Sequence, residues 1–145
     1  MVQNVNPTFV KTPNWGAVQI TTGTGSSTIV TVYTGGTNGS KISALIVTAN
    51  TTGAFDIQFG VSSGGTFYLY NALSVPAAAG SSDATPPLNL LSASNTPGLA
   101  VDSDGNPFIF LPSSAYTLQA KTPATSSTWA SGTVMSIIAP SVGDF

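Results

Sequence analysis

Every second residue is apolar between Phe55 and Val61, and the residues between them are polar or glycine. Successive side chains of a β-strand point to opposite faces of a sheet, so this period of two predicts a half-buried strand. Residues 116–121 repeat the pattern, with Tyr116, Leu118 and Ala120 expected to face inward. No part of the chain shows a convincing helical period, so the alternation predicts an all-β fold.

Further strand signals come from runs rich in Val, Ile, Thr and aromatic residues, which suit a pleated surface. These runs are residues 27–33, 41–49, 67–75, 108–111 and 133–139, with weaker signals at 19–22 and 88–91. Turn-forming segments separate several of them: Gly35–Gly39, Asn50–Gly53, Ser62–Gly65 and Asp102–Asn106. Short strands at this spacing predict an antiparallel β-sandwich or a β-barrel.

Two segments do not fit the alternation of strands and turns. Residues 1–16 contain Pro7 and Pro13 and are expected to form an extended N-terminal arm. Residues 76–98 are rich in small residues and are expected to form a long loop holding one short strand. The remaining chain, residues 17–145, is predicted to be a single sandwich domain, because no internal repeat or second domain is visible.

Ionisable residues are scarce. The 145 residues include three Lys, five Asp and no Glu, Arg or His, which gives a net charge of −2. Phosphate binding needs several basic side chains together, so a nucleic-acid partner is not expected. The apolar runs are too short to span a bilayer, and no Sec-type export signal is recognisable at residues 1–16, so no membrane partner is expected.

The same scarcity argues against catalysis. Without His, Cys or Glu, acid–base chemistry would depend on a few Asp and Lys side chains, and no nucleophile motif is present. We therefore expect a protein that is not an enzyme, with no catalytic residues and no cofactor.

One segment has the spacing of a cation-binding loop. Asp102, Asp104 and Asn106 place oxygen atoms at alternate positions around Gly105. A calcium loop of the EF-hand type would also need a carboxylate at its twelfth position, where Ser113 stands, and flanking helices. The alternative is a tight β-turn before residues 108–111, and we favour the turn.

The aromatic residues divide into two groups. Phe55, Phe59, Phe67 and Phe110 alternate with other residues on strands and are expected in the core. Four others are candidate interface residues, because large aromatic side chains dominate interface energetics: Phe9, Trp15, Tyr68 and Tyr70. Phe9 and Trp15 either fold back onto the sandwich or reach a neighbouring subunit.

Four segments resemble a known group of proteins: Asn4–Phe9, Val30–Ile42, Leu111–Leu118 and Gly143–Phe145. They are similar to small virion proteins of tailed bacteriophages, of the head-decoration type. The resemblance implies a β-sandwich or jelly-roll domain that is made in the host cytoplasm, forms a homo-oligomer such as a trimer, and binds the major capsid protein on the capsid surface. It carries over no individual site residue.

The expected function is therefore that of a capsid decoration or cement protein. A first alternative is a carbohydrate-binding module of a tail, fibre or head, with Trp15, Asp56, Tyr68 and Tyr70 as candidate sugar contacts. A second is a surface or pilus subunit that donates its N-terminal strand, against which the missing export signal counts.

Overall fold

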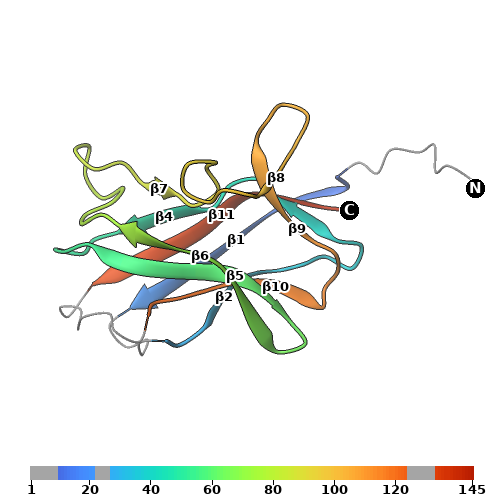
Figure 1. The fold of residues 1–145 in the computed structure, drawn as a ribbon, viewed down its shortest axis with the longest axis horizontal. Helices are drawn as coiled ribbons and strands as arrows, with labels where there is room; N and C mark the ends of the chain where they lie inside the picture. Colours follow the sequence, from blue (N-terminus) through green and yellow to red (C-terminus); the bar gives the residue numbers. More distant parts are fainter. Residues whose placement is uncertain (1–9, 22–26, 124–132) are drawn as a thin grey trace, which may run out of the picture.

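The computed structural model describes residues 10–21, 27–123 and 133–145. The regular elements of these residues are β-strands, and they form two antiparallel sheets (Figure 1). The all-β, antiparallel prediction is confirmed. In the same residues, no helix is long and apolar enough to cross a membrane.

The larger sheet, sheet A, is organised around its last strand. Its strands are β1 (Thr12–Thr21), β3 (Ser40–Ile42), β4 (Ile46–Ala49), β7 (Leu88–Asn89), β8 (Ala100–Val101), β9 (Pro107–Leu111) and β11 (Val134–Asp144). β11 pairs with β1 along one edge and with β3 and then β4 along the other. Figure 1 shows β1 and β11 running side by side through the molecule.

Sheet B has four strands in the order β2-β10-β5-β6. They are β2 (Val30–Thr34), β5 (Phe55–Ser63), β6 (Thr66–Val75) and β10 (Tyr116–Lys121). β5 and β6 form a hairpin whose turn residues Gly64 and Gly65 have φ values of 58° and 80°. Two consecutive positive φ values are typical of the tight turn that suits hairpin twist, and glycine adopts them without steric cost.

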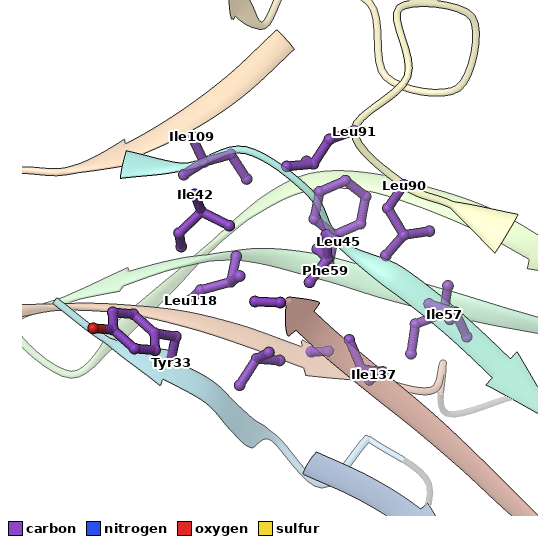
Figure 2. Packing of buried hydrophobic residues seen from close by; sticks show 14 of the residues in the cluster. Tyr33, Ile42, Leu45, Ile57, Phe59, Leu90, Leu91, Ile109, Leu118 and Ile137 are labelled. Atoms are coloured by element: carbon purple, nitrogen blue, oxygen red, sulfur yellow. The ribbon is translucent and has the colours of Figure 1, made fainter. Parts of the chain in front are cut away.

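The two sheets enclose one hydrophobic core. Figure 2 shows side chains of both sheets meeting between the layers, with Phe59 and Leu118 of sheet B near Ile42 and Ile137 of sheet A. Phe59, Leu118 and Ile137 are fully buried. Leu118 and Ala120 face inward as the alternation predicts, and Tyr116 packs against the core while partly exposed.

The structure moves the end of the predicted N-terminal arm. Thr12–Gly16 pairs with β11, beginning with Thr12 opposite Asp144, so residues 12–16 belong to sheet A and not to an arm. Residues 1–9 lie outside the described residues, so an arm there and a jelly-roll order of strands stay predictions. The predicted strand 41–49 is divided into β3 and β4, both of which pair with β11.

The long loop at residues 76–98 contains the predicted short strand, now β7, and contributes to the core. Ala79, Leu90 and Leu91 are buried, and Thr96 donates a 2.8 Å hydrogen bond to the carbonyl oxygen of Leu90. Leu90 and Leu91 lie among the core side chains in Figure 2. This loop is therefore part of the packed structure.

Candidate functional site

An open hollow of about 420 Å³ lies on sheet B, on the half of the β5–β6 hairpin nearest its turn. β5, β6 and β10 supply its lining, which consists of Val61, Ser63, Tyr68, Leu69, Tyr70 and Tyr116. In Figure 1 the tip of this hairpin lies apart from the strands of sheet A. The volume falls within the range of small-molecule sites. We call this surface the tyrosine hollow.

The ring of Tyr70 is supported from the core. It lies 6.3 Å from the ring of Phe59, centroid to centroid, with an interplanar angle of 18°. Phe59 is fully buried, whereas Tyr70 is 48% exposed. A stacked partner that cannot move restricts the exposed ring, so Tyr70 presents a preorganised aromatic surface.

A β-bulge gathers the aromatic residues of the hollow. In the β5–β6 register Phe59 pairs with Asn71 and Gly60 pairs with Leu69, which leaves Tyr70 as the extra residue. Bulges re-aim side chains, and here Tyr68, Leu69 and Tyr70 all line one hollow. The register from Thr66 to Leu69 is regular, so the bulge acts at Tyr70, which lines the hollow together with Tyr68.

A second candidate surface is the outer face of sheet A. Ala17 pairs with Ile138, which pairs in turn with Ile46, and cross-strand partners share a face. Trp15 follows the same alternation on β1 and is 67% exposed. Phe110 lies on the outer side of β9, because its neighbours Ile109 and Leu111 are buried. We call Trp15, Ala17, Ile46, Phe110 and Ile138 the apolar face.

Placing Phe110 on this face corrects the prediction that it belongs to the core. Its ring is 48% exposed and lies 6.0 Å from that of Phe145. Phe59 is buried as expected, whereas Phe55 and Phe67 are half-buried.

The apolar face is almost free of charge. The strands of sheet A carry two ionisable side chains, Lys41 and Asp144. The Lys41 ammonium forms a 3.1 Å salt bridge with Asp102 and lies 4.8 Å from the centroid of the Phe108 ring. Lys41 is the cross-strand partner of Phe110, so it lies on this face, and Asp102 compensates its charge there.

The Asp102 segment is a β-turn between β8 and β9. One carboxylate oxygen of Asp102 accepts hydrogen bonds from the backbone N–H groups of Asp104 and Asn106, at 3.1 and 2.9 Å. The other accepts from Lys41. The Asn106 N–H and then Lys41 hold the pKa of Asp102 below its usual value. One oxygen is thus bonded within the turn and the other to Lys41 of β3, which supports the turn interpretation over a cation site.

Asp144 joins the two sheets. Its carboxylate accepts hydrogen bonds from the Tyr33 hydroxyl at 2.8 and 2.9 Å, from Asn14 at 3.2 Å, and from the Ser40 hydroxyl. Burial alone would raise its pKa, but the bonds from Ser40, Tyr33 and Asn14 lower the pKa overall. Burial and then the bond to Asp144 raise the pKa of Tyr33. All four side chains are engaged with one another, so we assign this cluster a structural role.

The predicted interface residues do not form one site. Tyr68 and Tyr70 lie together in the tyrosine hollow on sheet B. Trp15 lies on β1 of sheet A, and Phe9 lies outside the described residues. Asp56, proposed as a sugar contact, is at the start of β5 opposite Ser74, at the other end of the hairpin from the hollow. Sequence reasoning did not name Leu69 or Tyr116 as site residues, and the β5–β10 pairing sets Tyr116 opposite Ser63 of the hollow.

Comparison with protein-family models, with curated proteins and with solved structures finds no match for this chain.

Proposed function

We propose that this protein is a structural component of a tailed-phage virion that binds the outer surface of the capsid and reinforces the shell. The apolar face of sheet A is the observation that carries the proposal. Outward-facing rows of a sandwich are ordinarily polar, as is the row of Gln19, Ser136 and Thr48. The adjacent row of Ala17, Ile138 and Ile46 is apolar and lies beside Trp15. The resemblance to decoration-type virion proteins supports the same function.

The physical basis of the proposed binding is apolar burial. Removing apolar surface from water stabilises a complex, and a face without uncompensated charge avoids the desolvation cost of burying ions. A protein that binds only the assembled capsid stabilises that state by mass action. On this proposal the partner is the major capsid protein, the location is the capsid surface, and the protein acts as a homo-oligomer such as a trimer.

A substitution in the middle of the apolar face tests the proposal. Ala17 is exposed, so Ala17→Lys should leave the fold intact while placing a charge between Trp15 and Ile138. We expect it to weaken binding to purified capsids that lack the protein by at least about tenfold, as measured by cosedimentation. The matched control is Ala72→Lys, which makes the same change at an exposed position of sheet B and should bind normally.

Salt dependence is a second readout. Binding by apolar burial should change by less than about twofold between low and high salt, because screening acts on charges. A steep loss of binding with salt would show that charge drives attachment. Absence of the protein from purified virions, judged by mass spectrometry, would refute the proposed function outright.

A further inference from the structure

We propose that the tyrosine hollow is a binding site for a neutral saccharide. This inference goes beyond the proposed function, because it concerns sheet B and a small ligand, whereas capsid binding is assigned to sheet A. Three observations carry it: the support of Tyr70 by a buried ring, the bulge at Tyr70 where Tyr70 and Tyr68 line one hollow, and the chemistry of the lining.

The aromatic surface has the form that a sugar ring requires. Tyr68 and Tyr70 are 59% and 48% exposed, so their rings are available to a ligand. The face of an aromatic ring is electronegative, and the C–H groups of a pyranose, polarised by neighbouring oxygens, pack against such a face. Because Phe59 stacks against Tyr70 in an offset arrangement, with 6.3 Å between the ring centroids, the Tyr70 ring loses little freedom when a ligand binds.

The polar groups of the hollow are hydroxyls. Ser63, Tyr68, Tyr70 and Tyr116 each offer one hydroxyl that can donate and accept a hydrogen bond, which matches the hydroxyls of a sugar. No Lys or Asp side chain is among the six lining residues. A charged ligand would lose hydration on binding, and this site has no opposite charge to offset that cost. The ligand class is therefore neutral rather than sialylated, sulfated or phosphorylated.

The main alternative to a saccharide is a second copy of the chain, with one of its strands paired to the edge of β6. That edge is poorly suited to such pairing. The bulge at Tyr70 interrupts the regular row of backbone groups, a device that protects sheet edges from further pairing. The backbone N–H of Ala72 bonds to the Asn71 side chain at 2.9 Å, and the Asn71 amide donates to the Asn95 carbonyl oxygen at 2.7 Å. The middle of β6, on the far side of the bulge from the hairpin turn, is therefore already engaged with the chain itself.

The experiment uses the full chain and a panel of neutral and acidic glycans on an array, followed by calorimetric titration with neutral disaccharides. We expect binding of at least one neutral glycan, with a dissociation constant of about 1 mM or tighter for the free disaccharide. Tyr70→Ala should weaken that binding by about tenfold or more, because the platform is removed. Tyr116→Phe, which removes only a hydroxyl, should weaken it by a few fold.

Matched controls separate the two proposals. Trp15→Ala removes an exposed aromatic residue outside the hollow and should leave glycan binding unchanged, as should Ala17→Lys. Tyr70→Ala should leave capsid binding unchanged. A melting temperature close to that of the unmodified protein is the criterion for using each variant. Tyr68→Ala serves in place of Tyr70→Ala if the latter unfolds.

Three results would overturn the inference. These are no binding of any neutral glycan at about 10 mM, binding that survives loss of both Tyr68 and Tyr70, and binding confined to acidic glycans. A monomer–dimer equilibrium that is abolished by Tyr70→Ala, without glycan binding, would assign the hollow to a second copy instead.

Discussion

The phenolic oxygen of Tyr33 lies 2.8 and 2.9 Å from the two carboxylate oxygens of Asp144. Tyr33 belongs to β2 of sheet B and Asp144 to the end of β11 in sheet A, so this contact links the two layers by a polar interaction. Asn14 on β1 and Ser40 on β3 bind the same carboxylate. Through these hydrogen bonds, the Asp144 side chain links three strands of sheet A to sheet B.

Removing the Tyr33 hydroxyl should destabilise the protein. We expect Tyr33→Phe to lower the free energy of unfolding by about 1–2 kcal/mol, because a partly buried carboxylate loses a donor. Urea denaturation measures this loss. The control is Tyr68→Phe, the same change at a tyrosine that is 59% exposed, which should stay within about 0.5 kcal/mol of the unmodified protein. Equal stability of all three proteins would show that the contact contributes nothing.

Acid should weaken the same link. Hydrogen bonds lower the pKa of Asp144 in the folded state despite its burial. A carboxyl with a depressed folded-state pKa stabilises the fold above its unfolded pKa, about 3.9, and this contribution is lost as pH falls through the folded-state pKa. Asp144→Asn should therefore flatten the loss of stability below about pH 4. The loss of stability in acid that is due to Asp102, whose pKa is also lowered, should remain in this variant.

Alkali should act through Tyr33. Its folded-state pKa is raised, so its contribution is complete below the unfolded value of about 10 and is lost as pH rises through the folded-state pKa. Tyr33→Phe should remove this component from a series of denaturation curves above about pH 10. An unchanged alkaline profile in the variant would contradict the assignment.

The bulge requires glycine at position 60. A Cβ atom there would lie 2.0 Å from the carbonyl oxygen of Tyr68, which is backbone and cannot rotate away. We expect Gly60→Ala to cost about 1–3 kcal/mol. Gly53→Ala is the matched control, because its Cβ meets nothing within 4 Å, and it should be neutral or slightly stabilising. Thermal and urea denaturation of both variants would reveal the difference.

The loop at residues 76–98 should behave as core. Leu90 is fully buried, so Leu90→Ala should cost about 2–5 kcal/mol. Val101→Ala, at a residue 58% exposed, should change stability by less than about 0.5 kcal/mol. If Leu90→Ala had as little effect as Val101→Ala, the loop would not be part of the folding unit.

The period of two predicted the strands well, because it shows which residues alternate between the two faces of a sheet. It could not tell which face of β9 is inner. Phe108 and Phe110 form one apolar row and Ile109 and Leu111 the other, and only packing between the sheets shows that the aliphatic row is buried. For the same reason the apolar face was not visible in the sequence.

The remaining differences come from contacts that carry no local signal. Thr12–Gly16 pairs with β11, which lies near the opposite end of the chain, and such a long-range pairing leaves no local signal. The local sequence, with Pro7 and Pro13, therefore favoured an arm. The bulge beside Gly60 depends on the close approach of two backbones, and it sets the place of Tyr70 in the tyrosine hollow. Tyr68 and Tyr70 were named as candidates from the sequence, whereas Tyr116 needed the β5–β10 register.

The central place of β11 has a consequence for synthesis. β1, β3 and β4 all pair with Val134–Asp144, so sheet A has no common partner strand until the ribosome has translated that stretch. A nascent chain paused before residue 134 should expose apolar segments and remain sensitive to protease. Ribosome-bound chains of increasing length should acquire protection in one late step, and protection gained gradually would show that the earlier strands find other partners first.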